Sequence, residues 1–101
     1  MQEINEIIRA IREWDPEARI ILFGSRARGE HLKYSDYDLI VVSKRFEGIP
    51  FIRRSALLLK HLYRRGIVMP LELLCYTTEE FERKKEELGV VREAVSYGVE
   101  L

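Results

Sequence analysis

Apolar residues along this chain switch repeatedly between helical and strand spacing. Near the N-terminus they recur three or four positions apart, which predicts an amphipathic helix that ends before Pro16. This stripe comprises Ile4, Ile7, Ile8, Ile11 and Trp14. Because Trp14 completes the stripe, we interpret it as a packing residue rather than as a platform for stacking a base.

Three later segments have the pattern of buried strands. Residues 18–23 are apolar and β-branched, and they lie between Pro16 and Gly24. Residues 36–42 read D-Y-D-L-I-V-V, and residues 70–77 read P-L-E-L-L-C-Y-T. We expect a short helix from Gly24 to about His31 and a mixed-charge loop over 43–49.

Helices are expected to separate and follow the last two strands. Residues 50–65 predict a long helix that begins at a proline and stops at Gly66. Its buried face would be Leu58, Leu59 and Leu62. Thr77 and Glu80 have the spacing of a capping box, for a helix ending near Gly89. Residues 90–97 predict a last short helix.

The alternation of strands and helices indicates an α/β fold, and 101 residues suit one domain spanning 1–101. The connection between the first two strands is too short for a parallel crossover. We therefore expect a small antiparallel or mixed sheet flanked by helices.

Two polar motifs stand at strand ends. The first, G-S-R-A-R-G, begins at Gly24, where a missing Cβ lets the backbone approach a ligand closely. Ser25 is expected to cap the helix that follows, whose free N–H groups suit phosphate oxygens. The guanidinium groups of Arg26 and Arg28 can pair with the same phosphates.

The second motif is the acid pair Asp36 and Asp38. Alternate residues of a strand share a face, so these carboxylates point the same way and repel one another unless a cation lies between them. Magnesium prefers such ligands together with phosphate oxygens. Each motif alone is common in ordinary turns and strand starts, but their succession favours a site for a nucleoside triphosphate and its magnesium.

The run G-S-R-A-R-G followed by S-D-Y-D-L resembles the signature of the polymerase β-like nucleotidyltransferase superfamily. Within it, nearly the whole chain resembles the minimal nucleotidyltransferase domains, which are often encoded beside a HEPN-domain partner. The resemblance implies a third carboxylate on a later strand, and Glu72 is the only acid in residues 70–77. Glu72 departs from the commoner Asp. The alternative is an edge strand with Glu72 in water, which Pro70 favours.

The resemblance also implies the chemistry. Asp36, Asp38 and Glu72 would be catalytic and would hold one or two Mg²⁺ ions. Gly24 and Ser25 would cradle the β- and γ-phosphates of ATP, while Arg26 and Arg28 would offset their charge. The leading hypothesis is transfer of AMP to a hydroxyl, such as a tyrosine of a HEPN partner, by an antitoxin. The alternatives are a binding module that neutralises its partner by contact, and transfer to a small molecule such as an aminoglycoside.

Composition limits the possible partners and the cellular compartment of the protein. Seventeen basic and seventeen acidic residues give no net charge, which argues against nucleic acid as the main partner. No leader or membrane span is expected, and the lone Cys75 suits the core of a cytoplasmic protein. The oligomeric state stays open.

The remaining basic residues are interpreted as solvated. His31 would lie in the loop between the two motifs, and His61 belongs to a basic cluster on the predicted long helix. The cluster comprises Arg53, Arg54, Lys60, Arg64 and Arg65. The alternative is contact with an acidic partner or RNA, but a solvated helix face is the simpler interpretation of this cluster.

Overall fold

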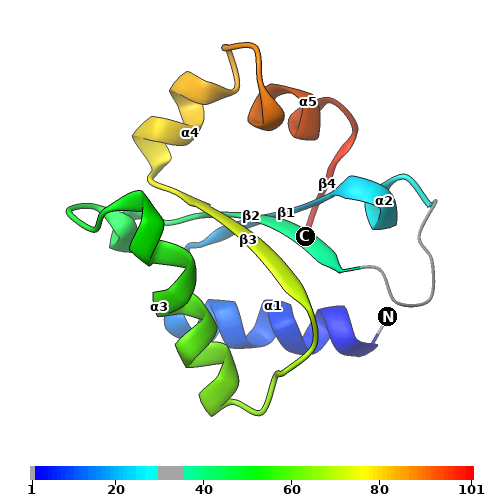
Figure 1. Cartoon of the computed structure of the whole chain (residues 1–101), viewed down its shortest axis with the longest axis vertical. Coiled ribbons are helices and arrows are strands. Elements are labelled where there is room, and N and C mark those ends of the chain that lie inside the picture. Colours follow the sequence, from blue (N-terminus) through cyan, green and yellow to red (C-terminus); the bar gives the residue numbers. More distant parts are fainter. Residues whose placement is uncertain (1, 30–35) are drawn as a thin grey trace.

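A four-stranded sheet lies between two pairs of helices in the computed structural model, which describes residues 2–29 and 36–101. Helices α1 and α3 cover one face of the sheet, and α4 and α5 cover the other (Figure 1). The helices are α1 Gln2–Trp14, α2 Gly24–Ala27, α3 Phe51–Arg64, α4 Thr78–Lys84 and α5 Val90–Tyr97. The strands are β1 Arg19–Phe23, β2 Tyr37–Val42, β3 Leu71–Tyr76 and β4 Val99–Glu100.

The sheet is mixed, with the strand order β3-β2-β1-β4. Strand β2 pairs antiparallel with β1 and parallel with β3, and β1 also pairs antiparallel with β4. The expected α/β fold with a small mixed sheet is therefore confirmed. The register places Phe23 opposite Asp38, and Asp38 opposite Glu72, so the ends of three segments meet at one place.

Two apolar clusters form the core, one on each face of the sheet. The α1 and α3 side buries the helical stripe against Leu39, Val41, Leu73 and Cys75. The α4 and α5 side buries Ile21, Phe23, Ile40, Val42, Phe81 and Val91. Strand alternation therefore directs Asp38 and Glu72 toward the α5 side, because their neighbours Ile40 and Leu74 pack there. Burial raises the pKa of the Cys75 thiol to about 12, as befits a core residue.

Some local expectations were wrong. Ser25 does not cap α2, because the turn begins at Gly24 and the N-cap is Phe23, without a side-chain bond. Helix α2 ends at Ala27, and α4 ends at Lys84 rather than near Gly89. Strand β4 was not predicted, because its two residues are too few to give an alternating pattern in the sequence. His31 lies outside the described residues.

The expected loop over 43–49 contains a 3-10 helix, Lys44–Phe46, whose Phe46 is fully buried. Its ring lies 5.1 Å from that of Trp14, which confirms the packing interpretation of the tryptophan. The capping box of Thr77 and Glu80 is also confirmed.

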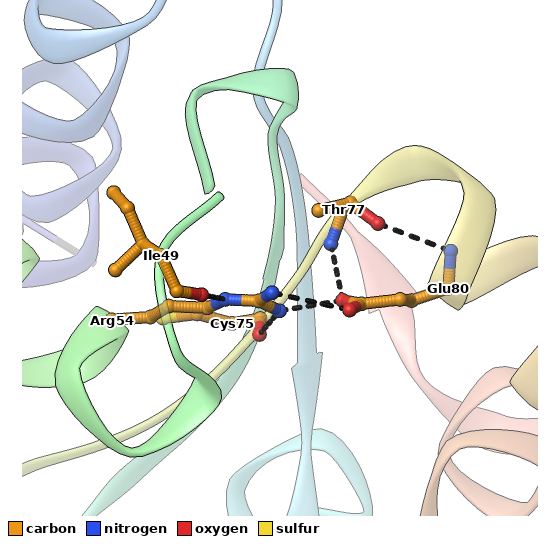
Figure 2. A network of polar contacts seen from close by, with 5 residues as sticks. All are labelled: Ile49, Arg54, Cys75, Thr77 and Glu80. Carbon is orange, nitrogen blue, oxygen red and sulfur yellow. Dashed lines mark hydrogen bonds and ion pairs between the residues drawn. The ribbon is translucent and has the colours of Figure 1, made fainter. Parts of the chain in front are cut away.

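Arg54 corrects the interpretation of the basic cluster as a solvated face. Only 5% of this residue is exposed. Its guanidinium donates to the carbonyl oxygens of Ile49 and Cys75 and forks onto both carboxylate oxygens of Glu80 (Figure 2). The pair joins α3, β3 and the start of α4. His61 is half-buried, with its Nε2 atom 2.9 Å from the carbonyl oxygen of Ala10.

Within the described ranges, no helix has the length and apolar character needed to cross a membrane.

Candidate active site

The backbone of Gly24 lies directly against the carboxylate of Asp38. Gly24 has φ +73°, a conformation that L side chains rarely adopt, and a Cβ here would lie 2.0 Å from Oδ2 of Asp38. The contact between Gly24 and Asp38 follows from the β1–β2 register, because Phe23 is opposite Asp38 and Gly24 is the next residue. Glycine is therefore required here for both its backbone conformation and the space it leaves.

The carboxylates of Asp38 and Glu72 lie side by side on neighbouring parallel strands. The pKa of Asp38 rises to about 6, chiefly through burial and then through the negative charge of Glu72. A hydrogen bond to Glu72 and the charge of Asp36 raise it further. The structure thus places Asp36 and Glu72 each within electrostatic reach of Asp38.

This set of acids suits a hard cation in its chemistry. Carboxylate oxygens are the preferred ligands of Mg²⁺, and a cation would remove the repulsion that raises the pKa of Asp38. Among the described residues, no three acids, histidines or cysteines are already gathered closely enough to hold a metal. Asp36 lies just before β2, and Glu72 lies on the edge strand β3, where its exposure agrees with the alternative interpretation of this residue. The donor types therefore suit Mg²⁺, but the described acids do not form a ready-made site.

The predicted phosphate-binding residues are only partly brought together. Ser25 is half-buried in the first turn of α2, beside Gly24. Arg26 instead lies with its guanidinium carbon 4.0 Å from the centre of the Tyr37 ring. Arg28 lies 4.1 Å from the centre of the Tyr97 ring and pairs with Glu93 at 3.1 Å.

Two residues of α5 at this site were missed by the sequence analysis. The backbone N–H of Gly24 donates to the hydroxyl oxygen of Tyr97 at 3.0 Å, and Glu93 holds Arg28. Their positions depend on β4, which pairs with β1 and returns the end of α5 to the Gly24 turn (Figure 1). The sequence shows that Glu93 and Tyr97 are four residues apart on a predicted helix, but this spacing does not specify which helix face contacts the Gly24 turn.

Replacing Gly24 with Ala should both destabilise the protein and displace the Asp38 carboxylate. The backbone strain alone is about 1–2 kcal/mol, and the contact with Asp38 adds to it. Gly29→Ala is the matched control, because Gly29 has φ +74° but a Cβ there meets nothing within 4 Å. Urea unfolding should show a larger loss for Gly24→Ala than for Gly29→Ala. Equal losses would mean that the contact with Asp38 is easily relieved.

The model of the nucleotidyltransferase domain family matches residues 4–100. The chain belongs to this family. The matched span of this nucleotidyltransferase domain includes the Gly24 turn, all three acids and α5.

Individual relatives agree with this assignment. The nucleotidyltransferase domain is 45% identical over 51 residues to MJ1305, a candidate protein adenylyltransferase of Methanocaldococcus jannaschii. That match covers 48% of this chain and 35% of MJ1305, so it spans about a third of the relative's length.

Solved structures share the fold. A candidate nucleotidyltransferase from Sulfolobus solfataricus superposes with a TM-score of 0.63 and 24% identity, covering 81% of this chain and 70% of the other. The crystal structure of a toxin–antitoxin with AMP-PNP superposes with a TM-score of 0.61 and 23% identity, covering 99% of this chain and 72% of the other. At these identities the likeness establishes the nucleotidyltransferase fold.

Proposed function

We propose that this nucleotidyltransferase domain transfers AMP from ATP, in the presence of Mg²⁺, to a tyrosine hydroxyl of a HEPN-domain partner and thereby acts as an antitoxin. The observation that carries the proposal is the contact of Gly24 with Asp38, which is itself paired with Glu72. In this arrangement, a backbone turn that can approach a phosphate closely lies beside carboxylates. The negative charges of these carboxylates favour the binding of a cation. A kinship with a candidate protein adenylyltransferase supports a protein acceptor.

Each residue has a role that follows from its position. Asp36, Asp38 and Glu72 would hold Mg²⁺, which when bound would neutralise the triphosphate and polarise the α-phosphate. The turn at Gly24 and Ser25 would donate hydrogen bonds to the β- and γ-phosphates, and Arg26 and Arg28 would offset their charge.

In the transfer step, the acceptor hydroxyl oxygen forms a bond to the α-phosphorus. The bond from that phosphorus to the β-phosphate oxygen breaks, and pyrophosphate leaves. The hydroxyl proton passes to the Glu72 carboxylate. Such a transfer depends mainly on positioning and charge neutralisation, which are what these residues supply.

A second candidate function is neutralisation of the partner by contact alone. It is favoured by the exposure of Glu72 and by the fact that the described acids are not gathered into a ready-made metal site. In that case the nucleotide pocket would be vestigial. The toxin–antitoxin neighbour is compatible with either candidate, because its likeness speaks for the fold.

The experiment that separates the two uses the product of the neighbouring gene. The purified chain, that product, ATP and MgCl₂ are incubated together, and the product is examined by intact-mass and peptide mass spectrometry. A gain of one AMP on a tyrosine, absent when that tyrosine is replaced by Phe, is the expected result. A tight complex without any gain in mass would favour neutralisation by contact.

A further inference from the structure

Two side chains of α5 contact the groups that the proposed function assigns to phosphate binding. The hydroxyl oxygen of Tyr97 accepts a hydrogen bond from the backbone N–H of Gly24, at 3.0 Å. The carboxylate of Glu93 accepts one from Arg28, at 3.1 Å. Arg28 also lies over the Tyr97 ring, so the two contacts form one connected group.

These contacts have the chemistry of a bound phosphate. An oxygen acceptor on a backbone N–H and an anionic oxygen on a guanidinium are the interactions that a phosphate makes with such groups. Glu93 and Tyr97 are four residues apart, so they lie on the same face of α5 and reach the turn together. A triphosphate approaching the Gly24 turn would meet both donors already in use.

We infer that Glu93 and Tyr97 mimic phosphate in the nucleotide-free protein, and that the triphosphate must displace them in order to bind. This inference rests on the proposed function, and it assigns α5 the role of a built-in competitor. It further predicts that weakening either contact makes nucleotide binding tighter.

The backbone at the end of α5 is held in place, so Glu93 would be released by rotation of its side chain, whereas Tyr97 packs partly buried against the core and has less room to rotate. The N–H of Leu101 donates to the carbonyl of Ile20 at 2.8 Å, and Arg12 donates to the Leu101 carbonyl at 2.8 Å. A Cβ on Gly98 would lie 2.4 Å from the Ala94 carbonyl oxygen, so this junction is tightly packed. Glu93 has a side chain that is 67% exposed, which leaves it room to turn into solvent.

The contacts to be broken are modest, so the competition should weaken binding without preventing it. One is a hydrogen bond to a neutral hydroxyl, and the other is an exposed ion pair. Removing the hydroxyl in Tyr97→Phe should tighten ATP binding about three- to tenfold. Removing the carboxylate charge in Glu93→Gln should tighten it about two- to fivefold.

The test is isothermal titration calorimetry with ATP in excess MgCl₂ on the wild type, Tyr97→Phe and Glu93→Gln. Glu13→Gln is the matched control, because Glu13 forms a similar exposed pair with Arg65 at 2.8 Å on another part of the surface. It removes the same charge, so it shows how much of any gain comes from the change in net charge alone. A gain in both α5 variants that exceeds that of Glu13→Gln is expected.

A second measurement needs no nucleotide. Amide hydrogen exchange at Gly24 should be faster in Tyr97→Phe than in the wild type, because its N–H has lost its acceptor. Unchanged or weaker ATP binding in Tyr97→Phe, with the wild type binding normally, would overturn the inference and leave the proposed function intact. A wild type that does not bind ATP at all would refute the proposed function, and the inference with it.

Discussion

Asp38→Asn is expected to abolish nucleotidyl transfer while making the nucleotide-free protein more stable above pH 6. Asp38 is the central acid of the site, next to Gly24 and Glu72. Under the proposed function, loss of this charge should weaken the binding of Mg²⁺, and loss of such electrostatic stabilisation lowers a rate about 100- to 1,000-fold or more. Transfer assays with labelled ATP measure this directly.

The gain in stability follows from the raised pKa of Asp38, about 6 against an ordinary 3.8. Because the folded protein holds this proton more tightly than the unfolded chain, ionisation destabilises the fold as pH rises from 3.8 through 6. Above pH 6 the destabilisation is about 1–2 kcal/mol, after allowance for solvent screening. Asparagine carries no such charge and avoids it.

Urea unfolding without metal at pH 3.5 and pH 8 would test this. The variant should gain over the wild type at pH 8 and show little gain at pH 3.5. Glu47→Gln, which changes an exposed acid outside the site, serves as the control and should be neutral at both. A less stable Asp38→Asn at pH 8, or one that transfers AMP at the wild-type rate, would contradict the assignment.

The second large effect concerns the pair of Arg54 and Glu80, where the loss of the acid should be more destabilising than the loss of the base. The Arg54 side chain is 7% exposed, while that of Glu80 is 29% exposed. Glu80→Gln keeps the capping position but leaves a buried guanidinium without a counter-charge, which costs about 3–5 kcal/mol. Arg54→Met leaves an acid that water can reach, so its loss should be smaller.

Equilibrium unfolding of the single variants and of the double variant measures this asymmetry. The double variant should be about as stable as Arg54→Met alone, because removing Arg54 removes the reason for the large penalty. Additive losses would show that the charges act independently. Either result leaves the active-site assignment untouched, because the pair lies between α3, β3 and α4 (Figure 2).

The same pair predicts that part of the protein's stability depends on pH in the acidic range. The Arg54 guanidinium holds the pKa of Glu80 down to about 2, against an ordinary 4.5. A lowered pKa contributes stability that is fully present above pH 4.5 and is lost as pH falls through 2. The stability difference between the wild type and Arg54→Met should therefore shrink between pH 4.5 and pH 2.

Patterns local to one segment were predicted well from the sequence. Residues 70–77 were expected to form a buried strand, and alternation along β3 places Leu73 and Cys75 in one core cluster and Leu74 against the other. The short connection correctly implied an antiparallel β1–β2 pair. That register then brings Gly24 to Asp38. The β2–β3 register places Asp38 opposite Glu72, and their role as site residues stays a prediction.

Features that depend on contacts between distant segments could not be predicted. Arginine on a basic helix is usually solvated. The burial of Arg54 is favourable only because Glu80 of α4 pairs with it. Tyr97 and Glu93 meet the Gly24 turn because a two-residue strand, too short to have its own pattern, returns the chain to β1. The spacing of residues within one segment does not predict such contacts between distant segments.

The central claim is that this site transfers a nucleotidyl group, and two labels on ATP test it most directly. The chain is incubated with the proposed partner, the product of the neighbouring gene, together with MgCl₂ and ATP labelled at either the α- or the γ-phosphate. Label from the α-phosphate should become covalently attached to the partner, and label from the γ-phosphate should leave as pyrophosphate, with neither attached when Asp38→Asn is used. Attachment of the γ-label, or of neither label by the wild type, would contradict the account.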